Sequence, residues 1–294
     1  MSDYKLVQLD VDTLKYLPQL YESVYKKRSP ANFFQLKYDT QYTGQQYLGY
    51  FAFWEDMPVA FYGVIPVKFL IRNETVLGAQ SCDTMTHSSH RKKGLFIKLA
   101  KMTFDLAKEK NIHFIFGFPN KNSYTGFVEK LGFLKTETMN RYTLKFTENW
   151  FKKVYRKLFF LLKRNSKIII KNKLLEQGFD GVIYDEEFIQ YKKYNKNTIL
   201  CNGENVFWLN TYGNMFLGAL EITNEKNLKE QLHFIEKKTK AASLTLIISR
   251  GTLLDEVLST LHVAEEGFPV IMKDLSGKFF LNQIRFQFAD IDIF

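Results

Sequence analysis

Residues 84–96 combine polar and basic side chains with a glycine at the expected start of a helix. The segment reads Thr-Met-Thr-His-Ser-Ser-His-Arg-Lys-Lys-Gly-Leu-Phe. The first N–H groups of a helix have no partner within the helix, and the helix dipole favours an anion at this end. Gly94 would let a phosphate approach the backbone closely, and three cations precede it: Arg91, Lys92 and Lys93. The segment predicts a phosphate-binding site, with an ordinary helix start under exposed lysines as the alternative.

Other common motifs for phosphates and metals do not fit this sequence. No GxGxxG follows the first expected strand and no GxxxxGK[ST] occurs, which excludes a dinucleotide fingerprint and a P-loop. Cys82 and Cys201 stand far apart, with no CxxC motif and no histidine at the spacing of a metal ligand. A disulfide framework and a zinc site are therefore not expected.

The elements that must position the basic segment follow from the apolar periodicity. The segment lies between an expected strand and an expected helix, and a second, short apolar strand after the helix is typical of a buried parallel strand. Ser123 can cap the helix that comes next. The expected elements are a helix at 10–27, strands at 47–53, 59–71 and 76–85, a helix from Gly94, a strand at 112–118, a loop at 119–123, a helix at 124–131, and a strand after Gly132 and Phe133.

This succession resembles the GNAT acetyltransferase superfamily. The family pattern has [RQ]-x-x-G-x-[GA] after the fourth strand, an asparagine in the loop after the fifth, and a helix that ends near K-x-G-F. The resemblance covers residues 5–145. It implies an α+β fold, in which a central mixed β-sheet is flanked by helices, and acetyl-CoA as co-substrate. The matching positions are Arg91, Gly94, Asn120 or Asn122, Lys130, Gly132 and Phe133.

The resemblance also implies which residues hold acetyl-CoA. Main-chain N–H groups of the basic loop would bind the pyrophosphate. The end of the preceding strand would pair with the pantetheine arm and orient the thioester carbonyl, and an asparagine of the later loop would hold that arm from the other side. The implied residues are Thr84, Met85, Thr86, Arg91, Lys92, Lys93, Gly94, Leu95, Phe96, Asn120 and Asn122.

Two positions depart from the family pattern. Phe96 stands where the family has glycine or alanine, so the loop can have a different shape. Val128 stands where many members have the tyrosine that protonates the leaving thiolate. Tyr124, one helical turn earlier, is the candidate to replace that acid, with simple packing as the alternative.

Acetyl transfer to an amine needs the amine unprotonated, which a carboxylate or a histidine can arrange. Asp83 lies on the strand next to the expected thioester site, and His87 and His90 lie in the loop. Asp83 is the first candidate for the base. The alternatives are that Asp83 caps a turn and that the histidines are solvated loop residues.

The second half of the chain repeats the order strand, helix, strand, helix, Gly-Phe, strand. It resembles the second domain of tandem GNAT proteins, which has lost the pyrophosphate loop, so no second CoA site is expected. Some tandem aminoglycoside-modifying members use the terminal carboxylate as the base, which makes Phe294 a further catalytic candidate. The predicted divisions are a GNAT-like acetyl-CoA-binding domain at 1–149, a basic connecting segment at 150–187 and a degenerate GNAT-like domain at 188–294.

The net charge of +10 is unevenly distributed. Residues 1–149 hold 20 basic and 14 acidic residues, residues 150–196 hold 12 and 5, and residues 197–294 hold 9 and 12. Residues 150–173 contain nine Lys or Arg, no acid, and apolar residues at helical spacing. This segment predicts a helix that packs between domains, which is favoured, or one that rests on an anionic membrane surface. No nucleic-acid motif accompanies the charge, so nucleic acid is not an expected partner.

The sequence therefore predicts an acetyl-CoA-dependent N-acetyltransferase that acts on a primary amine of a small acceptor, such as an amino sugar. The alternatives are a CoA-binding protein without catalysis and a peripheral membrane protein with the same fold. The longest run of aliphatic and aromatic residues, 158–162, is far too short to span a bilayer, and the start of the chain has no apolar signal region. A cytoplasmic location is expected.

Overall fold

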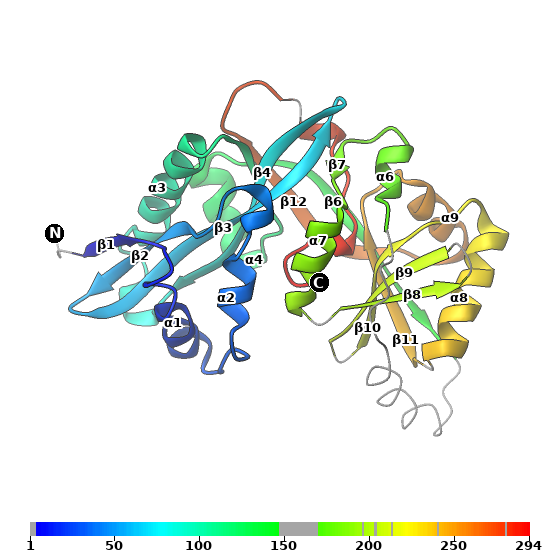
Figure 1. Ribbon diagram of the computed structural model, residues 1–294, viewed down its shortest axis with the longest axis horizontal. Helices are drawn as coiled ribbons and strands as arrows, with labels where there is room; N and C mark the ends of the chain where they lie inside the picture. Colours follow the sequence, from blue (N-terminus) through cyan, green and yellow to red (C-terminus); the bar gives the residue numbers. More distant parts are fainter. Residues whose placement is uncertain are drawn as a thin grey trace. The chain divides into compact units, whose positions relative to one another are not determined.

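The computed structural model describes residues 4–146, 170–195, 197–202, 205–212, 214–239, 241–279 and 281–294 (Figure 1). It divides into two compact units. Unit 1 contains Met1–Thr136 and Pro269–Asn282, and unit 2 contains Glu137–Phe268 and Gln283–Phe294. Most of the predicted basic helix, at 147–169, lies outside the described residues. In the described part of the chain, no helix has the length and apolarity needed to cross a membrane.

Unit 1 is built on a mixed β-sheet. Its strand order is β1-β2-β3-β4-β5, followed by the end of β12. Neighbouring strands are antiparallel except β4 and β5, which are parallel and joined by a helix. This confirms the predicted fold class. The strands are β1 (Lys5–Gln8), β2 (Leu48–Trp54), β3 (Met57–Ile71), β4 (Glu74–Thr86), β5 (Ile112–Gly117) and β12 (Glu265–Asp274).

Helices lie on both sides of this sheet (Figure 1). On one side are α3 (Leu95–Glu109) and the short α4 (Lys121–Thr125), and on the other α1 (Tyr16–Tyr25) and α2 (Phe33–Tyr38). The α3 sequence buries one face and leaves its lysines exposed, as an amphipathic helix does.

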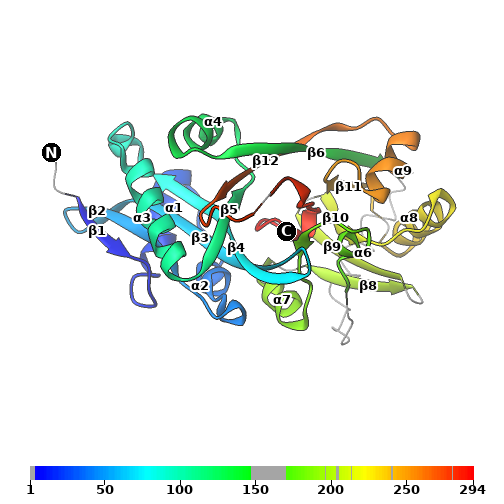
Figure 2. The same cartoon turned by 90° about the horizontal axis from the view of Figure 1, so that it is seen from above.

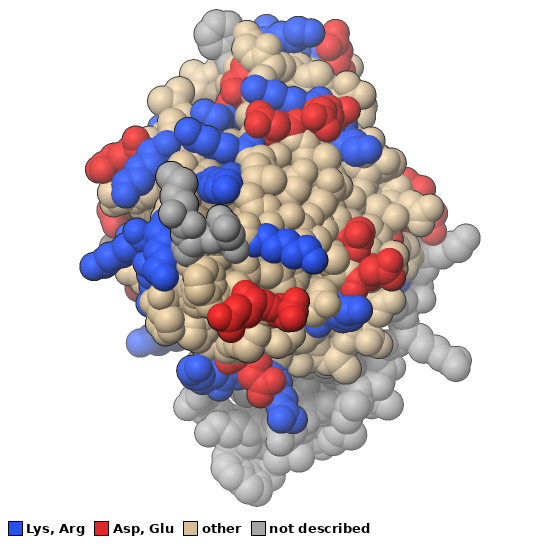
Figure 3. All heavy atoms as spheres, turned by 90° about the vertical axis from the view of Figure 1, so that its left-hand side faces the viewer, with Lys and Arg blue, Asp and Glu red and all other residues tan. Residues whose placement is uncertain are grey.

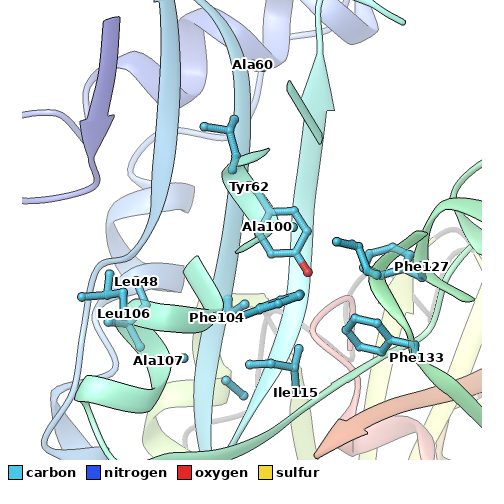
Figure 4. Close-up of a cluster of buried hydrophobic side chains, with 14 of the residues drawn as sticks. Leu48, Ala60, Tyr62, Ala100, Phe104, Leu106, Ala107, Ile115, Phe127 and Phe133 are labelled. Carbon is cyan, nitrogen blue, oxygen red and sulfur yellow. The ribbon is translucent and has the colours of Figure 1, made fainter. Parts of the chain in front are cut away.

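The core between the sheet and α3 is rich in aromatic rings (Figure 4). Tyr62 from β3 contacts Phe104 of α3 at a ring-centroid distance of 5.7 Å, and Phe104 contacts Phe133 at 5.8 Å. Phe127 packs edge-on against Phe133 at 5.1 Å. Such pairs stabilise beyond the area that they bury, so they fix the positions of α3 and of the segment after α4 relative to the sheet.

In unit 2 the strands lie in the order β6-β11-β10-β9-β8 and again form both parallel and antiparallel pairs. The parallel pair of β10 and β11 is again joined by a helix, α8 (Glu225–Thr239), and α9 (Leu253–Leu261) follows β11. The other elements are β6 (Leu134–Lys145), α6 (Lys173–Glu176), β7 (Gly181–Val182), α7 (Glu186–Tyr191), β8 (Thr198–Asn202), β9 (Asn205–Tyr212), β10 (Asn214–Leu220) and β11 (Ser243–Ile248).

The last strand of each unit comes from the other half of the sequence. In unit 2, residues 140–145 of β6 pair with β11, and in unit 1, residues 271–274 of β12 pair with β5. The boundary that the sequence suggests at residue 149 does not include this exchange. Local periodicity indicates that a segment forms a strand, but the partner of an edge strand depends on distant residues.

Candidate functional site

The start of α3 is an open helix terminus. Gly94 precedes the helix at φ +77° and ψ 1°, no side chain caps the terminus, and the first turn contains no acidic residue. A Cβ added to Gly94 would meet no atom within 4 Å, so the backbone here faces open space. Lys92 also has a positive φ, of 61°. These features leave the first N–H groups of α3 available to an anion.

The basic residues of the loop are exposed, and their side chains are partly anchored. Arg91 Nε donates to the carbonyl oxygen of Thr86 at 3.3 Å, and Lys93 Nζ lies 5.9 Å from the centre of the Trp54 ring. Figure 3 shows that Lys and Arg gather on one side of this end of unit 1, with Asp and Glu among them. The net attraction for an anion is therefore local to the loop, because nearby acids reduce the wider field.

The strand that leads into this loop loses one of its neighbours. Parallel pairing of β4 with β5 runs from Leu77 opposite Ile112 to Gln80 opposite Phe116 and ends there, whereas β4 continues to Thr86. On its other side β4 stays paired with β3 through Thr86, apart from a bulge. In the described part of the chain, the backbone of residues 84–86 thus has an edge that an extended ligand can pair with.

The loop after β5 is held by a cap on α4. Asn120 Oδ1 accepts from the N–H groups of Asn122 at 2.9 Å and Ser123 at 3.2 Å, so Asn120, and not Ser123, is the capping residue. Asn122 is exposed in the first turn. After α4 the backbone forms a π-helical turn, Gly126–Lys130, a geometry that is frequent at functional sites.

A sequence profile of the family described as acetyltransferase (GNAT) domain matches residues 9–135. This range contains the open start of α3, the unpaired end of β4 and the capped α4. Unit 1 is a GNAT acetyltransferase domain. The protein is accordingly an acyltransferase. Among curated protein sequences, none matches the chain.

Solved structures with the same fold span both units of the chain at low identity. A GCN5-related N-acetyltransferase from Kribbella flavida has a TM-score of 0.65 and 11% identity, over 94% of this chain and 73% of that one. A conserved protein of unknown function from Enterococcus faecalis has a TM-score of 0.66 and 12% identity, over 96% and 75%. The Saccharomyces cerevisiae N-myristoyltransferase with bound myristoyl-CoA has a TM-score of 0.57 and 13% identity, over 92% and 83%.

Within the GNAT domain, Asp83 forms an ion pair that the sequence does not reveal. Lys37 Nζ lies 2.8 Å from Asp83 Oδ2, and the Tyr38 hydroxyl donates to the same oxygen at 3.0 Å. The side chains of Lys37 and Asp83 are 3% and 14% exposed. Burial and the Asp83 charge raise the pKa of Tyr38 well above its usual range, which keeps this donor protonated. Lys37 and the Tyr38 hydroxyl thus both contact Asp83 Oδ2, so this oxygen already has partners within the fold.

The two loop histidines, His87 and His90, line the same cavity. It has a volume of about 210 Å³ and is also lined by Trp54 and by residues of α1 and the β2–β3 turn. Tyr4 Oη and His90 Nδ1 are 2.9 Å apart, and the ring centres of His87 and His90 are 6.0 Å apart. Burial and the neighbouring Lys93 lower the pKa of His90, so this ring is neutral at pH 7 and can accept a proton.

The two departures from the family pattern have a structural counterpart. The Phe96 ring packs against Gly126, where an added Cβ would lie 2.9 Å from Phe96 Cε1, and it contacts Phe127 at 5.3 Å. Phe96 therefore points into the core between α3 and α4. Tyr124 and Val128 are both half-buried against the same core, so Tyr124 as the acid stays a prediction.

Phe294 belongs to unit 2, where its side chain is fully buried. Its ring contacts Trp208 and Phe288, each at 5.5 Å, and lies over Gly218. Asn197 Nδ2 donates to its main-chain oxygen at 3.4 Å. These contacts give Phe294 a packing role, and its role as a base stays a prediction. Among the described residues, no three His, Cys, Asp or Glu side chains could hold a metal ion.

Proposed function

We propose that the protein is an N-acetyltransferase that transfers the acetyl group of acetyl-CoA to a primary amine of a small acceptor. One arrangement carries this proposal: β4, whose end has lost its partner on the β5 side, leads through the basic loop to the uncapped, acid-free start of α3. The first part suits the pyrophosphate, because helix N-termini bind phosphate groups. The second suits the pantetheine arm, because its amides can add to a strand edge.

In this reaction the amine nitrogen forms a bond to the thioester carbonyl carbon, and the carbon–sulfur bond breaks with its electron pair going to sulfur. Backbone groups of Thr84, Met85 and Thr86 pair with the pantetheine arm. A proton must leave the amine nitrogen, and His87, the neutral His90 and the ion-paired Asp83 are the candidates to accept it. The acceptor is proposed to be small and amine-bearing, such as an amino sugar.

Isothermal titration with acetyl-CoA and with CoA tests the phosphate site. Gly94→Glu places a carboxylate at the helix terminus, and Gly94→Ala is the matched control, because both add a Cβ at the same positive φ. We expect micromolar binding by the wild type, a small loss in Gly94→Ala and no detectable binding in Gly94→Glu. Equal affinity in Gly94→Ala and Gly94→Glu would contradict the proposed site.

Release of the CoA thiol in the presence of a panel of small amines tests the transfer itself. Val128 in place of the family tyrosine favours the second candidate, a CoA-binding protein without catalysis. Acetyl-CoA binding with thiol release for at least one amine supports the enzyme. Acetyl-CoA binding without amine-dependent thiol release supports the second candidate.

A further inference from the structure

A pair of hydroxyl groups stands where β4 and β5 part. Ser81 is the first residue of β4 beyond its pairing with β5, and its hydroxyl donates to the Tyr62 hydroxyl at 2.8 Å. Tyr62 is fully buried, whereas Ser81 is half-buried. Neither is used by the site as described above. The accessible member of the pair therefore lies at the opening, and the buried member holds it from behind.

Gly117, the last residue of β5, lies beside Ser81 without an internal reason to be glycine. Its backbone does not have a positive φ. A Cβ there would meet the Ser81 Cβ at 3.6 Å and Ile271 Cγ1 at 3.8 Å, which are ordinary contact distances. Neither the backbone conformation nor the packing within unit 1 requires residue 117 to be glycine. The remaining explanation is clearance for something that enters between the two strands.

The spacing along β4 matches the ligand expected here. From Thr86 at the loop to Ser81 the strand spans five residues, or about 17 Å at about 3.3 Å per residue. This is the scale of an extended pantetheine arm. An arm that starts at the loop and runs along the edge of β4 brings its sulfur to Ser81. Ser81 also faces the side of the sheet covered by α3 and α4, because its partner Tyr62 packs in that core, where Figure 4 shows the Tyr62 hydroxyl between Phe104 and Phe127.

We propose that the Ser81 hydroxyl, positioned by Tyr62, donates a hydrogen bond to the sulfur of the departing CoA thiolate. The proposal rests on the proposed function. When the carbon–nitrogen bond forms and the carbon–sulfur bond breaks, sulfur receives the electron pair and the negative charge. Ser81 turns its O–H to that sulfur while its oxygen accepts from Tyr62. The thiolate later takes the proton that the amine has lost, so neither hydroxyl is consumed.

The environment of Tyr62 suits a donor that keeps its proton. Burial raises the pKa of Tyr62 far above its usual range, and the bond from Ser81 offsets this only in part. Tyr62 therefore remains a neutral O–H and does not replace the family's tyrosine as an acid. The pair instead stabilises the charge on sulfur, which lowers the need for a dedicated acid at Val128.

Three variants separate the roles. Ser81→Ala removes the donor, and Tyr62→Phe removes only the hydroxyl behind it and keeps the ring. Ser259→Ala, at an exposed position of α9, is the matched control. We expect kcat/KM with acetyl-CoA to fall about 10- to 100-fold in Ser81→Ala, because a hydrogen bond to a charged group is lost. The loss is smaller in Tyr62→Phe and absent in Ser259→Ala.

Two readouts distinguish a bond to sulfur from a general disturbance. The pKa of the CoA thiol in the protein complex, followed by thiolate absorbance, should be lower for the wild type than for Ser81→Ala. With acetyl-seleno-CoA, whose selenolate is a weaker base, the activity defect of Ser81→Ala should shrink. An unchanged thiol pKa, or an equal defect with sulfur and selenium, overturns the role of Ser81.

The same measurements keep this inference separate from the proposed function. If the wild type does not bind acetyl-CoA, the proposed function fails, and with it the role of Ser81. If the wild type binds and transfers while Ser81→Ala is as active, only the role of Ser81 fails. Gly117→Ala adds a check that does not depend on the hydroxyls: we expect unchanged folding and a KM for acetyl-CoA raised at least severalfold. A KM equal to that of the wild type would contradict the clearance role of Gly117.

Discussion

The two units share an arrangement of strands and differ in what lies beside the strands where they separate. In each, a parallel pair of strands is joined by a helix and separates after a few residues, at Gln80 opposite Phe116 in unit 1 and at Leu217 opposite Leu246 in unit 2. Each first strand has a register shift just beyond that point. The difference lies in what comes next to the separated strands.

In unit 2 the chain's own C-terminal segment takes this place. Ile248 of β11 pairs with Asn140 of β6 on one side and forms an antiparallel bridge with Gln287 on the other. Ser249 N–H donates to the Phe286 carbonyl oxygen at 2.8 Å. The Phe294 ring packs on Gly218, which lies at the register shift of β10. In unit 2, peptide of the C-terminal segment thus lies beside the separated strands and satisfies backbone groups there (Figure 2).

The helices that follow differ in the same sense. Helix α3 starts after a glycine with no acid in its first turn, whereas α8 has Glu225 in its first turn. A carboxylate at this position competes with an incoming phosphate for the helix terminus. The same topology therefore accommodates the proposed ligand site in unit 1, whereas in unit 2 the chain's own C-terminal segment fills the corresponding place.

Replacing the C-terminal ring should have the largest effect, because it tests whether the segment is structural. We expect Phe294→Ala to lower the free energy of unfolding of unit 2 by about 3–5 kcal/mol, since it removes a fully buried ring. Denaturant unfolding and hydrogen exchange of β10 and β11 measure this. Ile293→Ala is the control, because Ile293 is 52% exposed. Equal stability of the two variants would mean that the segment does not hold unit 2 together.

The buried Asp290 should make the stability of unit 2 dependent on pH. Burial raises its pKa to about 7, and the bonds from Gln287 N–H and the Tyr184 hydroxyl, both 2.7 Å, offset this in part. Because the folded pKa lies above the unfolded value of about 4, the stabilisation is complete below pH 4 and is lost as pH rises to 7. It amounts to roughly 4 kcal/mol at most.

The measurement for Asp290 is the difference between the wild type and Asp290→Asn in denaturant unfolding at several pH values. Asp290→Asn removes the ionisation, so its stability relative to the wild type should rise from pH 4 to pH 7. Taking the difference cancels the contributions of carboxylates whose pKa is lowered, such as Asp274. The stabilisation that those groups provide is lost as the pH falls. A difference that stays constant over this range would show that Asp290 does not titrate there.

Elements with clear periodicity were predictable from the sequence, and shorter ones were not. Apolar runs identified β4, β5 and the helix that starts after Gly94 within two residues. The first helix was expected from residue 10 but begins at Tyr16, because Asp10 and Thr13 bond to each other in a turn before it. The short α2 (Phe33–Tyr38) had no pattern to reveal it, since six residues make less than two turns.

Some features of the candidate site were predictable from local sequence, and others were not. The basic loop and Gly94 carry a local signal, because an uncapped helix terminus is built from neighbouring residues. The Lys37–Asp83 ion pair and the Ser81–Tyr62 hydroxyl pair join residues that are 46 and 19 positions apart. Sequence identified Asp83 as a carboxylate near the strand end, but only the fold reveals that a buried lysine faces it.

The Lys37–Asp83 ion pair provides the next test. Asp83 lies at the register shift of β4, just as Gly218, on which Phe294 packs, lies at the register shift of β10. Lys37→Met keeps the length of the side chain and leaves the Asp83 charge nearly buried, so we expect a loss of about 3 kcal/mol in the stability of unit 1. Asp83→Asn in the same chain should recover most of it. Arg28→Met, which breaks an exposed pair with Glu22, should have no measurable effect. Equal losses in the single and double variants would exclude an uncompensated charge as the cause.

The smallest expected effect concerns the contact between Phe96 of α3 and Gly126, which follows α4. A methyl group on Gly126 would lie 2.9 Å from the Phe96 ring, so Gly126→Ala should cost about 1 kcal/mol, even though alanine favours helices. In a Phe96→Ala background the ring is absent, and the same change should become stabilising by a few tenths of a kcal/mol or more. Thermal and denaturant unfolding of the four chains gives this double-mutant cycle. A sign reversal shows that Phe96 is turned toward α4 and away from the loop at Gly94, which leaves that helix terminus open as its counterpart in unit 2 is not. The same sign in both backgrounds would place the Phe96 ring elsewhere.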